Sequence, residues 1–141
     1  MDVGIGYGFL KEKVAWNIRV NTIYESKSSL RPGIIIGTGS VQTFKSDQSL
    51  YIQAYKSFDI ANSSMLRVSI GLASLVPDFE KMYALTGITI TLNQSWSTFG
   101  NFDGRSLIPG VTWSPSDWLT VAGMIIEGKF LAIFLGYRFS R

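Results

Sequence analysis

Nine stretches of this chain alternate large apolar residues with small or polar ones, a period of two that is typical of β-strands. The expected strands cover residues 2–10, 13–24, 32–44, 48–60, 64–75, 82–94, 105–114, 117–126 and 129–139. Polar turn residues separate these stretches, and helical periodicity does not persist between them. Consecutive strands are therefore expected to pair antiparallel, as an up-and-down meander in a single β-barrel domain covering residues 1–141.

The two sides of each expected strand differ in size and polarity. One side is apolar, as in Val14, Trp16, Ile18 and Val20, in Leu66, Val68, Ile70 and Leu72, and in Leu131, Ile133, Leu135, Tyr137 and Phe139. The other side is small or polar, as in Gly4, Gly6 and Gly8, in Asn17, Arg19 and Asn21, and in Ala132, Phe134, Gly136 and Arg138. A soluble barrel would expose that second side and need Lys and Glu on it. The pattern instead predicts a transmembrane barrel with a crowded polar interior and an apolar face toward lipid.

Composition supports a surface that is not fully in water. Charged residues make up 16% of the chain, against roughly 25% in an average soluble domain, and aromatic residues make up 13%. No apolar run reaches the length of about 18 residues that a transmembrane helix needs. The expected strands are about the length that crosses a bilayer at a tilt near 45°. The sequence therefore predicts crossing by strands.

Aromatic residues recur at the ends of the expected strands. Trp113 and Trp118 flank one turn, Tyr24 ends a strand, and Tyr137 and Phe139 close the chain. Aromatic rings in such positions form the interfacial girdles of membrane barrels. These five residues are the candidate interfacial aromatics.

The segment Leu135-Gly136-Tyr137-Arg138-Phe139 resembles the C-terminal strand of bacterial outer-membrane β-barrel proteins. The resemblance implies a location in the bacterial outer membrane and recognition of this strand by the barrel-assembly machinery. Two features depart from the usual pattern. Ser140 and Arg141 follow the last aromatic residue, and Lys56 falls on the otherwise apolar side of its strand.

The number of strands poses a question, because single-chain bacterial barrels have even numbers and nine stretches are counted here. Eight or ten strands are expected. Either one stretch is misassigned, most plausibly around residues 95–114, or the chain lacks an upstream strand. Residues 95–104 are assigned to a long connection, in which Trp96, Phe99 and Phe102 could form a contact surface.

Four charged residues fall on the polar side of their strands, namely Arg19, Arg67, Arg138 and Asp59. They are candidate interior residues that set ion selectivity, with the arginines favouring anions. The alternative is a network of ion pairs and hydrogen bonds that plugs the interior. A barrel of eight strands is just filled by side chains, which favours the plug, whereas ten strands leave more space.

Several functions are disfavoured by residue content. The chain has no His and no Cys, and its acidic residues fall mainly in turns without fixed pairing, so neither a catalytic site, nor a metal site, nor a cofactor is predicted. The net charge of +3 is scattered, which argues against a nucleic-acid partner.

The function expected from the sequence is that of a non-catalytic outer-membrane β-barrel, acting as a scaffold or anchor or as a narrow passive pore for small solutes. Its expected partners are membrane lipid, the assembly machinery and a further protein. Two alternatives stay open: a soluble lipocalin-like barrel that carries a hydrophobic ligand, and a fragment of a larger membrane barrel.

Overall fold

The fold consists of β-strands and the turns between them. The computed structural model of the chain describes residues 1–8, 13–39, 48–61, 64–76, 79 and 81–139. Its strands are β1 (Asp2–Gly8), β2 (Lys13–Ile23), β3 (Gly33–Gly39), β4 (Gln48–Ala61), β5 (Ser64–Val76), β6 (Met82–Thr91), β7 (Trp96–Phe102), β8 (Leu107–Ser116), β9 (Leu119–Ile126) and β10 (Phe130–Arg138). The expected strand ends at residues 9–10 and 40–44 lie outside the described residues.

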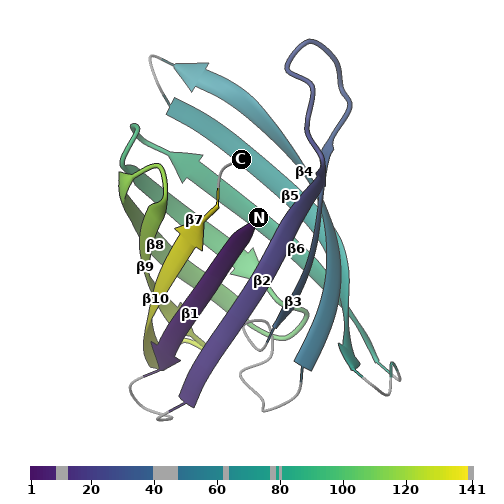
Figure 1. The fold of residues 1–141 in the computed structure, drawn as a ribbon, viewed down its shortest axis with the longest axis vertical. Helices are drawn as coiled ribbons and strands as arrows, with labels where there is room; N and C mark the ends of the chain where they lie inside the picture. The colour runs from purple at the N-terminus through teal and green to yellow at the C-terminus, as the bar shows by residue number, and fades with distance from the viewer. Residues whose placement is uncertain (9–12, 40–47, 62–63, 77–78, 80, 140–141) are drawn as a thin grey trace.

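The strands form a closed antiparallel barrel in which each strand pairs with its neighbours in sequence (Figure 1). β1 pairs with β2 on one side and with β10 on the other, and the first and last strands close the ring. The backbone of Met1 extends this seam, because its carbonyl accepts a hydrogen bond of 2.9 Å from Phe139. The prediction of an all-β, up-and-down barrel is confirmed, with ten strands.

The strand that the sequence analysis did not expect, β7, lies where a long connection was predicted. β7 covers Trp96–Phe102 and pairs with β6 on one side and with β8 on the other. The assignment of residues 95–104 to a loop was therefore wrong. With an even number of strands, β1 begins and β10 ends at the same end of the barrel. We call this end the terminal end; it also carries the loop of residues 24–32 between β2 and β3.

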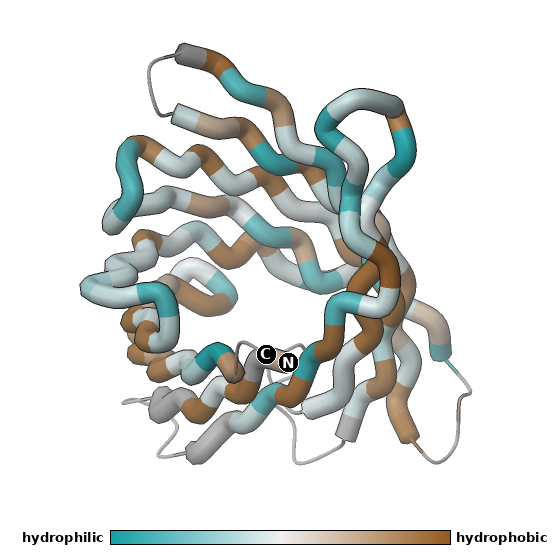
Figure 2. Tube along the Cα trace, turned by 45° about the horizontal axis from the view of Figure 1, so that its top comes forward, coloured by the Kyte–Doolittle hydropathy of each residue, from teal (hydrophilic) through white to brown (hydrophobic). Residues whose placement is uncertain are grey.

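Hydrophobic and more polar residues alternate along the strands, as the colours of the tube in Figure 2 show, and successive side chains of a strand point to opposite faces. In β10, Ala132 and Phe134 point inward and are buried, whereas Leu131, Ile133 and Leu135 are exposed. The side of the last strand that carries the large apolar residues thus lies outside the barrel. The closed ring has space inside only for the side chains of the opposite face.

Glycines on the inner face make room for aromatic rings from the neighbouring strand. Gly33 and Gly37 of β3 lie opposite Tyr55 and Tyr51 of β4. A Cβ atom at either glycine would overlap the facing ring at less than 3.0 Å. The tyrosine rings therefore lie flat over β3. The same arrangement joins Phe99 of β7 to Gly110 of β8.

The wall of the barrel is uneven at the terminal end, because β3 is much shorter than β4. Pairing between the two strands begins at Gly33 and Tyr55, whereas β4 continues to Ala61. Over its last residues β4 keeps β5 as a partner but has no β3 residue beside it. The loop of residues 24–32 lies next to this exposed stretch of β4 (Figure 1).

Candidate functional site

The outer surface of the barrel carries a belt of exposed apolar side chains. Every strand contributes, with Ile5, Ile18, Ile36, Ile52, Ile70, Ile88, Phe102, Val111, Ile125 and Leu135 as one example from each. Ile70, in the middle of β5, is 66% exposed. A monomeric soluble protein rarely exposes a continuous apolar surface of this extent. The belt is the most extended candidate interaction surface of the described residues.

Lys56 is the only charged residue at the outward positions of the described strands, and a bond to the backbone explains its place. Its ammonium group donates hydrogen bonds to the carbonyls of Ser26 at 2.6 Å and of Ser29 at 2.8 Å. Both carbonyls belong to the loop of residues 24–32. Lys56 departs from the outward apolar pattern because it holds this loop against β4.

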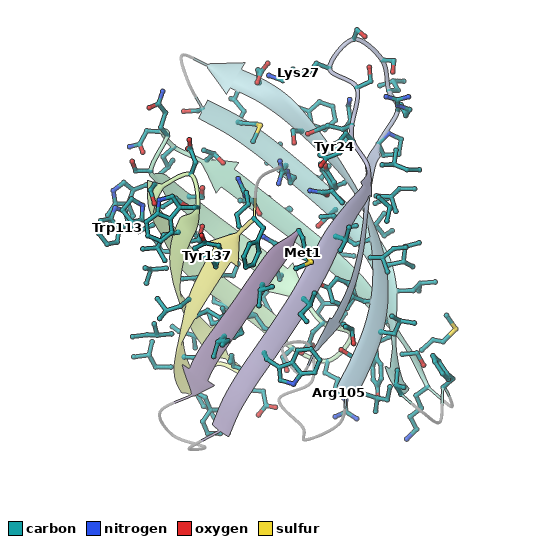
Figure 3. The ribbon with its side chains drawn as sticks, in the orientation of Figure 1. Met1, Tyr24, Lys27, Arg105, Trp113 and Tyr137 are labelled. Carbon is teal, nitrogen blue, oxygen red and sulfur yellow. The ribbon has the colours of Figure 1, made fainter. Side chains whose placement is uncertain are left out.

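Aromatic rings gather at the terminal end of β7, β8 and β10. Trp96 stacks on Trp113 with 6.2 Å between ring centroids, Trp118 lies 5.6 Å from Tyr137, and Tyr137 lies 4.6 Å from Phe139. We call these five residues the aromatic rim. Four of them were predicted as interfacial aromatics, whereas Trp96 was assigned to a connection, as part of a contact surface or as an interfacial anchor. Figure 3 shows Trp113 and Tyr137 of this rim.

Tyr24, the fifth predicted interfacial aromatic, does not belong to the rim. It follows β2 at the start of the loop of residues 24–32, where its side chain is 70% exposed. The aromatic residues at the terminal end thus occupy two places, the rim along β7 to β10 and the β2–β3 loop.

The interior divides into an apolar half and a polar half. The apolar half lies away from the terminal end and is built from two packed clusters. One cluster contains Ile108, Met124, Ile126, Ala132 and Phe134, and the other contains Tyr51, Ala73 and Leu85. These side chains are at most 9% exposed. The expectation of a polar interior was therefore wrong for these two clusters, where apolar side chains pack against one another on the inner face.

The polar half lies toward the terminal end and includes Arg67, Ser57 and Tyr55. The guanidinium of Arg67 donates a hydrogen bond of 3.0 Å to the hydroxyl of Ser57 and lies 4.7 Å from the ring centroid of Tyr55. It also lies 4.0 Å from the carboxylate of Glu25. Arg67 is thus held by one polar group, one ring and one negative charge.

Glu25 reaches this group from the β2–β3 loop. Its carboxylate accepts a hydrogen bond of 2.8 Å from the backbone N–H of Ser57, on the stretch of β4 that has no β3 neighbour. Burial acts to raise the pKa of Glu25, but hydrogen bonds from Ser57 and the charges of Arg67 and Lys56 outweigh it. The pKa therefore lies below its ordinary value of 4.5.

The other predicted interior charges lie apart from Arg67. Arg19 on β2 and Arg138 on β10 are both exposed, and each lies opposite Asp2 of β1 in register. Two strands separate β2 from β5, which carries Arg67. Asp59 is exposed near the end of β4, opposite Met65. The structure thus brings Arg19 and Arg138 near one another, but it does not gather the four charges into one site.

Two further observations bear on the class of protein. Among the described residues, no helix is long and apolar enough to cross a membrane, and no three potential ligands among His, Cys, Asp and Glu come together as a metal site. No protein-family model matches this chain, and no curated protein matches it in sequence. The fold shown by the structure is an all-β, closed, ten-stranded antiparallel barrel.

Proposed function

We propose that this chain is a non-catalytic β-barrel of the bacterial outer membrane, which serves as an anchor or scaffold in the bilayer. The observation that carries the proposal is the belt of exposed apolar side chains contributed by all ten strands. Such a belt is stable where lipid covers it and costly where water does. The outer-membrane location rests on the resemblance of the C-terminal strand, through which the assembly machinery would recognise the chain.

The packed half of the interior favours an anchor over a pore. Phe134, Met124 and Leu85 lie inside the ring and are nearly inaccessible to solvent. Apolar side chains packed on the inner face reduce the space left for hydrated ions. The polar half, with exposed Arg19 and Arg138, is the part of the interior open to water or to a protein partner.

The direction of the side chains also weighs against a lipocalin-like carrier. Such a carrier would enclose its hydrophobic ligand with the large apolar side of each strand. In this barrel Leu131, Ile133 and Leu135 lie on the outside instead. The alternative of a soluble carrier is therefore the weaker one.

A first test is folding with and without detergent micelles, followed by circular dichroism and by gel mobility before and after boiling. We expect β-structure and heat-dependent mobility with detergent only. A monomer that folds cooperatively in plain buffer would refute the proposal.

A substitution makes the same test at one residue. Lysine in place of Ile70, at the middle of β5, should cost about 2–4 kcal/mol of stability in lipid vesicles, because it places a charge near the bilayer midplane. Gln94→Lys is the control, since Gln94 is exposed in the turn between β6 and β7, and it should cost nothing. The measurement is urea unfolding in vesicles. Equal stability of the two variants would place Ile70 in water and contradict a membrane position.

A further inference from the structure

The loop of residues 24–32 combines exposed apolar groups with positive charges. Tyr24 and Leu30 are 70% and 88% exposed, and Lys27 and Arg31 are exposed as well. Figure 3 shows Lys27 and Tyr24 at the terminal end of the barrel, with Arg105 at the opposite end. Apolar tips between cations are suited to the boundary between lipid chains and charged head groups.

The one acidic residue of the loop is turned away from this surface. The carboxylate of Glu25 bonds to the backbone of Ser57 and faces Arg67 on the inner side of β4. It therefore does little to neutralise Lys27 and Arg31. Among the described residues, no salt bridge joins Lys27 or Arg31 to a carboxylate, so the loop keeps a positive charge whose complement is an anionic surface.

The loop is also held in position before any ligand binds. Lys56 projects from the outer face of β4 and binds the carbonyls of Ser26 and Ser29. Within the loop, the N–H of Ser26 donates to the carbonyl of Arg31 at 3.2 Å. Ordering the loop therefore costs little on contact with a surface, which favours binding there.

We propose that the loop of residues 24–32 binds the phosphates of anionic lipid head groups through Lys27 and Arg31, with Tyr24 and Leu30 inserted beside them. This inference rests on the proposed membrane position of the barrel. Each cation near an anionic bilayer contributes about a fivefold increase in association, equivalent to about 1 kcal/mol. The loop would thus fix the barrel in the leaflet that is rich in negative charge.

The absence of Cys allows a single reporter in the loop. Ser28→Cys carries an environment-sensitive fluorophore, and the protein is inserted in vesicles of phosphatidylcholine or of phosphatidylcholine with phosphatidylglycerol. We expect the emission to shift to the blue with phosphatidylglycerol. Salt at about 0.5 M should reverse the shift, because it screens the attraction between charges more than a few ångströms apart. Lys27→Ser with Arg31→Ser should abolish most of the shift at the same phosphatidylglycerol fraction, because each cation removed weakens the association of the loop with the lipid about fivefold. Lys81→Ser with Lys129→Ser removes the same charge from the opposite end and should leave the shift unchanged.

Gel mobility before and after boiling is read from the same samples and reports insertion separately. If the barrel inserts but the emission of the loop reporter is the same in both lipids, the lipid site is refuted and the anchor proposal stands. Failure to insert in either vesicle refutes the anchor proposal instead. A blue shift that appears only when a second protein is added would assign the loop to a protein partner and overturn the lipid site as well.

Discussion

The tyrosine rings over β3 provide a sharp test of how the interior is packed. In Gly37→Ala, the new Cβ atom would overlap the ring of Tyr51 at less than 3.0 Å. The ring is buried, and its hydroxyl exchanges hydrogen bonds with the amide of Asn17 at 3.0 and 3.2 Å. Because the three atoms nearest to the new Cβ all belong to the side chain of Tyr51, this side chain must move, and these hydrogen bonds must lengthen or break.

The expected cost follows from three terms. Overpacking costs about 1–3 kcal/mol, and the lost hydrogen bond costs about 0.5–1.5 kcal/mol. Replacing glycine by alanine in a strand returns about 0.5–1 kcal/mol. The net loss of stability is therefore about 0.5–4 kcal/mol. Gly123→Ala is the control, since a Cβ atom there would meet nothing within 4 Å, and it should gain about 0.5–1 kcal/mol.

The measurement is urea unfolding in detergent micelles, followed by tryptophan fluorescence, for both variants. A double-mutant cycle adds Gly37→Ala in a Tyr51→Ala background, where the ring is gone and the substitution should cost nothing. Equal midpoints for Gly37→Ala and Gly123→Ala would refute the reasoning. So would a cost of Gly37→Ala that persists without the tyrosine ring.

Three further predictions concern the interior and the loop. Truncating Phe134 and Met124 to Ala should produce ion conductance in planar bilayers that the parent barrel lacks, whereas Ile133→Ala on the outer face should not; conductance of the parent would contradict a packed interior. In the opened variant, charge reversal at Arg19, Arg67 and Arg138 should shift the reversal potential toward cations, and an unchanged potential would remove these residues from any selectivity role. The lowered pKa of Glu25 means that its contribution to stability is full above its ordinary pKa of 4.5 and is lost as pH falls through the lowered value. Protease nicking of the loop should therefore increase in that acidic range, and Glu25→Gln should be nicked equally at all pH values; a parent protein with no such acid dependence would show that the carboxylate does not hold the loop.

The barrel could be predicted from the sequence because period-two alternation and the size difference between the two sides act in every strand. β7 was missed because Ser97, Gly100 and Asn101 are common in turns. Its boundaries do carry a local signal. The side chains of Asn93 and Asp103 accept hydrogen bonds from backbone N–H groups two and three residues later, forming a polar turn on either side of β7.

The Glu25 site could not be predicted in the same way. It depends on β3 being shorter than β4, which leaves the N–H of Ser57 without a β3 residue beside it. Only the pairing register reveals that mismatch, and the register is set by contacts between distant residues. The apolar half was missed for a related reason. Each of the three strands β8, β9 and β10 carries only one or two large apolar residues on its inner face. They form a core only when the strands lie side by side and bring Phe134, Met124 and Ile108 together.

The divided interior gives the barrel two independent supports. A barrel held only by lipid on its outer face would tolerate little change within its wall, since each substitution would act on the same marginal balance. Here the packed half supplies a core of its own, in the manner of a soluble domain. The side chains that pack the two clusters are thus separate in space from the charged side chains toward the terminal end. A substitution of Arg67 or Glu25 therefore leaves the packing of both clusters in place.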